Sequence, residues 1–280
     1  MIARVFPRLT NATPRDEYSF FGGPGLFIPE NISEVHVSVA FTWDLPAAER
    51  LVKEWSKIAP ARIGGPATGQ RGEDFEAGKY LADGYVITSR GCPNQCWFCS
   101  VPLREGREIR ELDIKDGWNI LDDNLLACSD SHIISVFNML ERYKRTHKHP
   151  IEFTGGLEAK RLKGWHVDYL QRLRPKQIFF AYDTNDDLEP LREAAKLFKE
   201  AGYGSRSILR CYVLVGYPGD SFESTEERLK TVVDIGMCPM AMLYRDKTGA
   251  TTFPWRRFQR SWARPAAIYA NINNQKGEAD

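Results

Sequence analysis

The sequence lacks a long apolar run. Nowhere do ~18 apolar residues follow one another, which is the length that a membrane-spanning helix needs. The opening stretch MIARVFPRLT also lacks the continuous apolar segment of a secretory leader. We therefore expect a cytoplasmic protein with no membrane partner.

An excess of charge is missing as well, because 38 basic residues nearly cancel 37 acidic ones. Global charge therefore gives no indication of a nucleic-acid or membrane partner. There is no internal repeat and no low-complexity segment. With 280 residues, 42% apolar and 12% aromatic, the chain has the composition of a globular protein with one large domain, or a domain and a smaller companion.

Cysteine is scarce, and its distribution is uneven. Six cysteines in 280 residues are too few for a disulfide framework. Three of them, Cys92, Cys96 and Cys99, fall within the stretch CPNQCWFC. Clustered thiols in a reducing compartment indicate a metal site or a catalytic site.

The type of site depends on which other ligands accompany these thiols. Cys96 and Cys99 form a C-x-x-C pair, as in zinc knuckles and redox dithiols. Zinc would need a second ligand pair, and His147 and His149 lie in a cationic run where capping a helix end and facing solvent is the expected role. The other cysteines are isolated on or beside predicted strands: Cys128, Cys211 and Cys238. A dithiol leaves Cys92 unexplained, whereas an iron–sulfur cubane with three thiolates keeps one iron open.

The N-terminal region predicts a small α/β lobe. Residues 1–34 are rich in Pro, Gly and Asn, and we expect an irregular arm there. Residues 35–41 alternate as a strand, and residues 45–59 have helical spacing with Asp44 as a plausible N-cap. ARIGGPA predicts a second strand, which completes one β-α-β unit, and TGQRGEDFEAG is the best linker candidate.

Beyond the linker, apolar runs alternate with helical patterns. The predicted strands cover residues 85–89, 118–126, 151–156, 177–182, 208–216 and 240–244. The helical stretches between them include 132–144, 166–173, 188–201 and 224–235. Six strands separated by helices predict a parallel sheet with right-handed crossovers. In the barrel form of this architecture the chemistry lies on loops after the strands, and the cysteine loop follows the first strand of the series.

At these residues the sequence resembles the radical S-adenosylmethionine (radical SAM) enzymes. CPNQCWFC has their C-x-x-x-C-x-x-C spacing, with an aromatic before the last cysteine. The resemblance implies that Cys92, Cys96 and Cys99 bind a 4Fe–4S cluster and that S-adenosylmethionine chelates the fourth iron. It further implies a 5′-deoxyadenosyl radical that abstracts hydrogen, and Phe98 lying against the adenine.

The resemblance extends to the loops after later strands. Asp122, Asp123 and Asn124 are similar to the Asp-Asp-Asn variants of methylthiotransferase-like and cobalamin-linked members, where this loop holds the methionine amino group. An Asx turn is the alternative reading. Glu158 and Arg161 correspond to a charged pair that contacts cofactor or substrate in similar enzymes, or else form an ordinary surface pair.

Two further loops complete the predicted cofactor contacts. Asp183 and Thr184 align with a Glu-Ser pair near the ribose, although the carboxylate is one methylene shorter, and Asp186 or Asp187 could cap the next helix. GYPGD at Gly216 resembles a Gly-x-Pro-Gly-Glu run whose backbone packs beside the adenine, with Asp220 in place of glutamate. Arg210, on the preceding strand, could face the barrel interior and a carboxylate.

The two ends of the chain are read differently. The first 65 residues resemble a shortened cobalamin-binding domain, but the Asp-x-His-x-x-Gly signature is absent and His36 lacks both partners, so we expect a structural lobe without cobalamin. FPWRRFQRSWARP places Trp255, Phe258 and Trp262 on one apolar face. Packing is the favoured role of this tail, and a basic aromatic surface for nucleic acid is the alternative.

The sequence therefore predicts a partial (β/α)6 radical SAM barrel with a small N-terminal α/β lobe. The lobe and linker cover 1–80, the radical SAM core 81–250 and the tail 251–280. The resemblance implies an electron donor such as flavodoxin or ferredoxin. It does not identify the substrate, which could be a small molecule, a peptide or a nucleic acid. The alternatives are a non-catalytic zinc or iron–sulfur protein, with Cys128 as a fourth ligand, and an RNA methyl or methylthio transferase.

Overall fold

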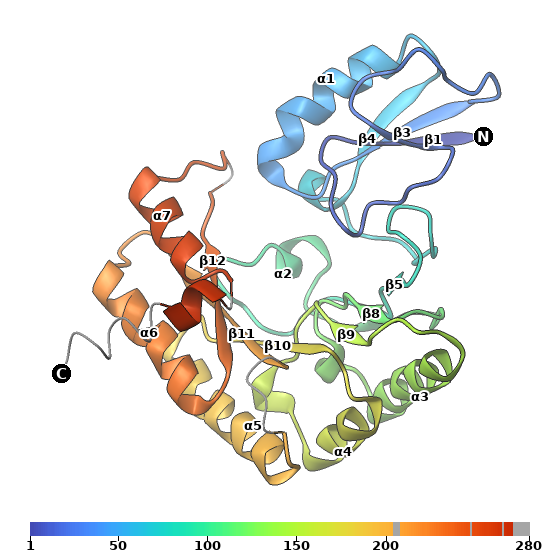
Figure 1. Ribbon diagram of the computed structural model, residues 1–280. Helices are drawn as coiled ribbons and strands as arrows, with labels where there is room; N and C mark the ends of the chain where they lie inside the picture. Colours follow the sequence, from blue (N-terminus) through green and yellow to red (C-terminus); the bar gives the residue numbers. More distant parts are fainter. Residues whose placement is uncertain (204–207, 247, 265, 271–280) are drawn as a thin grey trace. The chain divides into compact units, whose positions relative to one another are not determined.

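The chain folds into two compact units in the computed structural model, which describes residues 1–203, 208–246, 248–264 and 266–270 (Figure 1). Residues 1–123 with 248–249 belong to the first unit, and Asn124–Asp246 with the chain from Ala250 onward forms the second. The predicted domain limits at residues 80 and 250 stay predictions.

A four-stranded parallel sheet begins the first unit. Its strands are β1 (Ile2–Phe6), β2 (Ser19–Phe21), β3 (Glu34–Ser38) and β4 (Ala61–Gly64), in the order β2-β1-β3-β4. The expectation of an irregular arm over residues 1–34 is therefore wrong, because β1 and β2 lie within it. Both strands are short, and the segment between them contains two prolines, so their alternation is hard to detect in the sequence.

Helix α1 (Leu45–Trp55) packs on this sheet and forms its core with apolar residues of β1 and β3. Trp55, Val35 and Val37 are fully buried there. Asp44 occupies the N-cap position, after the short 3-10 turn η1 (Thr42–Asp44), but its side chain makes no capping bond. Its carboxylate instead accepts from Nε and Nη2 of Arg8 at 2.7 and 2.8 Å, a bidentate contact that is stronger than a bond to a backbone amide.

The remainder of the first unit consists of short elements. These are the 3-10 turn η2 (Pro66–Thr68), the parallel pair β5 (Tyr85–Val86) and β8 (Asn119–Ile120), the antiparallel pair β6 (Ser89–Arg90) and β7 (Arg110–Glu111), and helix α2 (Val101–Arg104). The strands predicted over 85–89 and 118–126 are much shorter than expected. Polar side chains that turn back to the backbone end β8 early, as described below.

The second unit alternates strands and helices. Its parallel strands are β9 (Glu152–Phe153), β10 (Gln177–Ala181), β11 (Leu209–Val215) and β12 (Cys238–Leu243), neighbours in that order. The helices are α3 (Asp130–Thr146), α4 (Gly164–Leu173), α5 (Leu188–Glu200), α6 (Phe222–Ile235) and α7 (Phe253–Ser261), with 3-10 turns η3 (Leu125–Ala127), η4 (Ala159–Arg161) and η5 (Asn185–Asp187). The predicted mixed α/β class with parallel strands is confirmed.

Helices α3 to α6 cover one side of strands β9 to β12 (Figure 1). Side chains at alternate strand positions, such as Phe180 and Val213, are buried on that side, and Phe180 meets Phe198 of α5 edge-on at 5.9 Å between ring centroids. Alternation of inward and outward residues along each strand explains why one sheet face holds the apolar core. The buried Cys211 belongs to this face.

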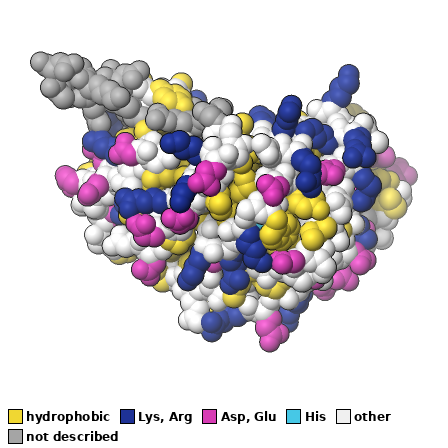
Figure 2. All heavy atoms as spheres, turned by 90° about the horizontal axis from the view of Figure 1, so that it is seen from below, with side chains coloured by type: hydrophobic (Ala, Val, Ile, Leu, Met, Phe, Trp, Pro, Cys, Tyr) yellow, Lys and Arg dark blue, Asp and Glu magenta, His cyan; other side chains and the backbone are white. Residues whose placement is uncertain are grey.

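The surface carries both signs of charge. On the face drawn in Figure 2, Lys and Arg side chains are interspersed with Asp and Glu. This mixture agrees with the near balance of 38 basic and 37 acidic residues. Within the described ranges, no helix has the length and apolarity that crossing a membrane requires.

Candidate functional site

The three clustered cysteines lie on a loop that is closed at its base. The chain leaves β6, passes through Cys92 to Cys99 and α2, and returns as β7, with Ser89 paired to Glu111 and Arg90 to Arg110. The Cys92 amide donates to the carbonyl of Gly106 at 3.3 Å. The loop is therefore a lobe whose two ends are hydrogen-bonded together.

Gly91 allows the two ends to cross closely. Its φ is +93°, and a Cβ at this position would lie 2.2 Å from the carbonyl oxygen of Glu108. An L-residue would meet both the steric penalty of positive φ and a backbone collision. The glycine directly before the first cysteine is thus required by the crossing of the chain.

The three cysteines form no disulfide, and their exposure differs. Cys96 is exposed, whereas Cys92 and Cys99 are partly buried. The Cys99 amide donates to the carbonyl of Cys96 at 3.0 Å, which fixes the C-x-x-C turn. Burial raises the pKa of the Cys99 thiol, and the nearby Cys92 contributes to the increase. Ligation would therefore exchange a proton for a metal at Cys99.

The three thiols are donors of the kind that iron–sulfur clusters use. No group of three or more His, Cys, Asp or Glu side chains in the described part of the chain is gathered closely enough to hold one metal ion. In a cubane each thiolate binds its own iron, so the ligands do not need to converge on one point. Three thiols on one closed loop, at least one of them exposed, match that requirement.

Asp122 and Asp123 hold the start of the cysteine loop. The buried Asp122 carboxylate accepts from the Thr88 amide at 2.5 Å and from the hydroxyls of Thr88 and Ser89 at 2.6 and 2.8 Å. Asp123 accepts from the Gly91 amide at 3.0 Å. Burial raises the pKa of both carboxyls, and these bonds lower it. The two predicted cofactor contacts thus already bind the strand that leads into the loop.

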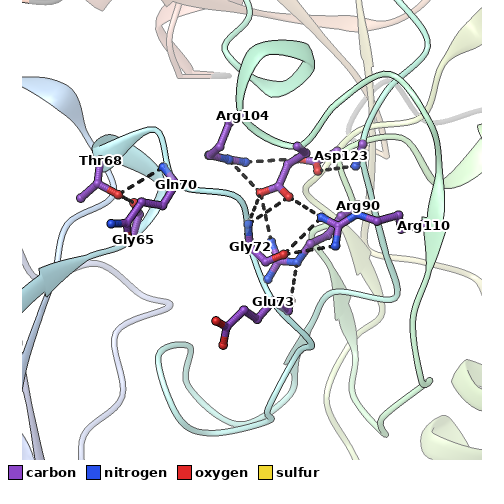
Figure 3. A network of polar contacts seen from close by, with 11 residues as sticks. Gly65, Thr68, Gln70, Gly72, Glu73, Arg90, Arg104, Arg110 and Asp123 are labelled. Carbon is purple, nitrogen blue, oxygen red and sulfur yellow. Dashed lines mark hydrogen bonds and ion pairs between the residues drawn. The ribbon is translucent and has the colours of Figure 1, made fainter.

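A buried carboxylate, Glu105, lies at the other end of the loop, in the polar network that includes Gly72, Arg104 and Arg110, which are labelled in Figure 3. Glu105 directly follows α2, and its side chain is only 1% exposed. It accepts from Nε of Arg104 at 2.9 Å and from Nη2 of Arg110 at 2.7 Å, and Nη1 of Arg90 lies at 3.6 Å. The Gly72 amide donates to both carboxylate oxygens, at 3.2 and 3.1 Å.

This network connects the loop to its own base. Arg90 and Arg110 face each other across the β6–β7 ladder, so Glu105 lies between two like charges that would otherwise repel. Arg104 also extends toward Asp123, with Nη2 and Oδ1 3.6 Å apart. Sequence reasoning missed these residues. The only signal was the density of alternating charges in PLREGREIRE, directly after the cysteines.

The predicted aromatic contact, Phe98, is partly buried on the loop. Its ring meets Trp97 edge-on, with 5.4 Å between centroids, and Trp97 is 59% exposed. Elsewhere in this unit His36 is buried against the hydroxyl of Tyr80 and accepts from Nε of Arg62 at 2.9 Å. His36 is thus part of a polar row on the four-stranded sheet.

In the second unit, Asn124, Glu158 and Arg161 are brought together. Nδ2 of Asn124 and Nε of Arg161 both donate to Oε2 of Glu158, each at 2.7 Å. Asn124 is buried, whereas the Arg161 side chain is 40% exposed. The structure therefore joins Asn124 to a predicted charged pair that begins 34 positions later in the sequence. The bond to a buried amide distinguishes Glu158 from an ordinary surface partner.

Asp183 lies after β10, beside β11. Its Oδ1 accepts from the Leu214 amide at 2.8 Å. Burial raises the pKa of Asp183 to about 6, despite this hydrogen bond. Asp187 accepts from the amides of Asp183 and Thr184 at 3.0 and 2.8 Å and so caps the turn η5. It also occupies the predicted N-cap position of α5, where its side chain makes no capping bond.

The turn after β11 is held by Asp220. This carboxylate is fully buried, accepts from the Gly216 amide at 2.8 Å and pairs with Nη2 of Arg228 at 3.1 Å. Gly216 has φ +73°, and a Cβ there would lie 2.9 Å from Cδ2 of Trp255. An aromatic ring therefore packs against this glycine, and in the structure it belongs to Trp255 of α7.

Arg210 is distant from that turn. It lies at the start of β11, six residues before Gly216, which corresponds to ~20 Å along a strand. The buried guanidinium stands 5.7 Å from the ring centroid of Phe179, and its Nε has no hydrogen-bond partner among the described residues. The structure does not bring Arg210 to the strand end where Asp183 and Gly216 lie.

The isolated cysteines and histidines are also placed. Cys128, Cys211 and Cys238 are buried, as expected of structural thiols. His147 occupies the C-cap of α3 and stacks on Tyr143 with 4.0 Å between ring centroids, which confirms its predicted capping position. His149 is exposed.

Comparison with known proteins gives only a loose structural likeness. No family model matches the chain, and no curated protein matches it. Among solved structures, coproporphyrinogen III oxidase (HemN) from Escherichia coli, described as a radical SAM enzyme, superimposes with a TM-score of 0.38 and 14% sequence identity. The overlap covers 65% of this chain and 47% of that one, so the chain spans about half of its length. A likeness this loose is reported as such and supports no conclusion about activity.

Proposed function

We propose that the loop Cys92–Cys99 binds a 4Fe–4S cluster through its three thiolates and that the protein is a radical SAM enzyme. One observation carries the proposal. A loop closed at its base carries three cysteines, none of them in a disulfide, in the C-x-x-x-C-x-x-C spacing. Such a donor set leaves one coordination position free for a substrate-like ligand.

Reductive cleavage of S-adenosylmethionine to methionine and a 5′-deoxyadenosyl radical is the chemistry that such a cluster supplies when bound. The protein's own residues would orient the bound groups and shield them from water. Asp122 and Asp123 fix the backbone from Thr88 to Gly91, and Glu105 fixes the segment after α2. The Cys99 thiol, whose pKa is raised by burial, must lose its proton before it can bind iron.

The remaining predicted contacts are part of the same proposal. We keep Phe98, Asp122, Asp123, Asn124, Asp183, Arg210 and Gly216 as cofactor contacts, and Glu158 with Arg161 as residues that act on substrate. Their support differs. Asn124, Glu158 and Arg161 form one hydrogen-bonded group, whereas Arg210 lies at the opposite end of β11 from Gly216. An electron donor such as flavodoxin or ferredoxin and a partial (β/α)6 barrel also belong to the proposal, and the substrate is left open.

Anaerobic reconstitution tests the metal part of the proposal. The purified chain is incubated with iron, sulfide and a thiol reductant, then analysed for iron, sulfide and zinc and by electron paramagnetic resonance after reduction. We expect ~4 irons and a signal that changes when S-adenosylmethionine is added, because a ligand reaches the open iron. Zinc without iron, or a cluster whose resonance signal does not change when S-adenosylmethionine is added, would support a non-catalytic metal protein instead.

A further inference from the structure

Helix α7 has two contrasting faces. Its apolar side packs on the second unit: Trp255 and Phe258 lie 4.3 and 5.4 Å from the ring of Phe222 on α6, measured between centroids. Trp262, directly after the helix, is 2% exposed, and its carbonyl accepts from the Ala241 amide of β12 at 3.0 Å. Trp255 and Phe258 are half-buried on this side, in agreement with the packing role that the sequence favours.

The other side of α7 carries positive charge that no neighbouring carboxylate among the described residues neutralises. Arg256, Arg257 and Arg260 are exposed, and within the described ranges none of them forms an ion pair. The helix itself contains no acidic residue. Some exposed arginines of this unit are paired, such as Arg172 with Glu141 at 3.1 Å and Arg192 with Glu189 at 2.6 Å. What distinguishes α7 is that three exposed arginines follow one another at helical spacing on a helix without an acidic residue.

The helix lies at the strand end where α/β proteins bind ligands. Trp255 packs against Gly216, which directly follows β11, and ligands of parallel sheets bind beyond the carboxyl ends of the strands. At the start of the same helix, Phe253 is 68% exposed. An exposed aromatic and three free guanidinium groups thus stand together beside that edge.

We propose that this face of α7 binds single-stranded nucleic acid, with Arg256, Arg257 and Arg260 contacting phosphates and Phe253 stacking on a base. Guanidinium groups recognise phosphate, and an exposed ring offers a platform to unpaired bases. A membrane surface fits less well, because the apolar side that would enter the lipid is occupied by Phe222 and β12. The proposal requires no cluster and is independent of the proposed enzyme activity.

Binding of a labelled oligonucleotide to the full-length apoprotein tests the proposal. Fluorescence anisotropy with a 20-nucleotide single-stranded RNA is measured at several salt concentrations for the wild type and for R256A/R257A/R260A. Three neutralised phosphates predict a slope of about −2 for log K against log salt. We expect the triple variant to bind at least tenfold more weakly and with a slope near zero.

Two matched variants make the test specific. R192A/K196A/K199A removes the same charge from the exposed side of α5 and should bind as the wild type does. F253A should weaken binding about fivefold or more while keeping the salt slope, because stacking contributes ~1–3 kcal/mol per base. The proposal is overturned if the wild type does not bind, if the α5 variant loses as much affinity as the α7 variant, or if anionic vesicles or poly-glutamate compete as well as unlabelled RNA does.

Discussion

The buried carboxylate of Asp122 accepts two hydrogen bonds from one residue, Thr88: one from its amide at 2.5 Å and one from its hydroxyl at 2.6 Å. A third bond comes from Ser89. These bonds join the segment after β8 to the strand that leads into the cysteine loop. The strand that leads into the loop is therefore held by Asp122, which lies 34 positions after Thr88 in the sequence.

Replacing Asp122 by Asn should destabilise the protein. The amide group would direct N–H donors at the Thr88 or Ser89 donors and leave at least one of them unsatisfied, at a cost of ~1–3 kcal/mol. Urea unfolding measures the change. Asp186→Asn is the matched control, because Asp186 is exposed and should change stability by less than ~0.5 kcal/mol. Equal effects of the two substitutions would contradict the role given to Asp122.

Glu105 should be one of the most sensitive positions of the first unit. Glu105→Ala removes the acceptor of Gly72, Arg104 and Arg110 and leaves buried positive charge, which costs ~3–5 kcal/mol in comparable networks. Glu105→Gln keeps the shape and should cost less. Urea unfolding gives the free energies, and amide hydrogen exchange over residues 91–108 should accelerate.

The control for this network is Glu189→Gln. Glu189 pairs with Arg192 at 2.6 Å but its side chain is 73% exposed, so its loss should change stability by less than ~1 kcal/mol. If Glu105→Ala unfolds at the same urea concentration as Glu189→Gln, the buried carboxylate does not hold the loop.

The repeating part of the fold could be predicted from the sequence, whereas the role of the cysteines stays a prediction. Long apolar strands such as β11, and helices with regular spacing such as α5, carry their period in local residues. The spacing of Cys92, Cys96 and Cys99 is likewise a local property. Each of these predictions required only neighbouring positions along the chain.

What failed depended on distant partners. Asp44 occupies the predicted N-cap position of α1, but its carboxylate binds Arg8 and makes no capping bond. The strand predicted over 118–126 ends at Ile120, because Asp122 turns back to Thr88. Glu105 has no periodic signal, because its partners Gly72 and Arg110 are set by the folded loop.

Asp183 should make stability depend on pH. Its pKa is raised to about 6, mainly by burial, from 3.8. A raised pKa means that the folded state favours the proton, so this contribution is fully present below about 3.8 and is lost as pH rises through about 6. At ~1.36 kcal/mol per pKa unit the loss is about 2–3 kcal/mol.

Asp183→Asn isolates this contribution, because the amide oxygen can still accept from Leu214. The stability of the variant relative to the wild type should increase between pH 4 and pH 7 in urea unfolding experiments, since other titrating groups cancel in the difference. A difference that stays constant, or that falls with pH, would show that burial does not raise this pKa.

Gly216 and Trp255 should be energetically coupled. Gly216→Ala places a Cβ 2.9 Å from the Trp255 ring at positive φ, and we expect a loss of ~1–3 kcal/mol. In a double-mutant cycle, Trp255→Leu should remove the collision with the new Cβ and so regain part of the lost stability. The cost of positive φ at residue 216 should remain. Strict additivity of the two substitutions would mean that the ring does not limit this position.

Formation of 5′-deoxyadenosine by the reconstituted chain is the most direct test of the central claim. The product is quantified by mass spectrometry after incubation with S-adenosylmethionine and dithionite, for the wild type, Cys96→Ala and Cys128→Ala. Three cysteines that hold an open cluster predict product from the wild type and from Cys128→Ala, and none from Cys96→Ala. A wild type that carries four irons yet forms no product, or a Cys128→Ala variant that loses its iron, would contradict the account.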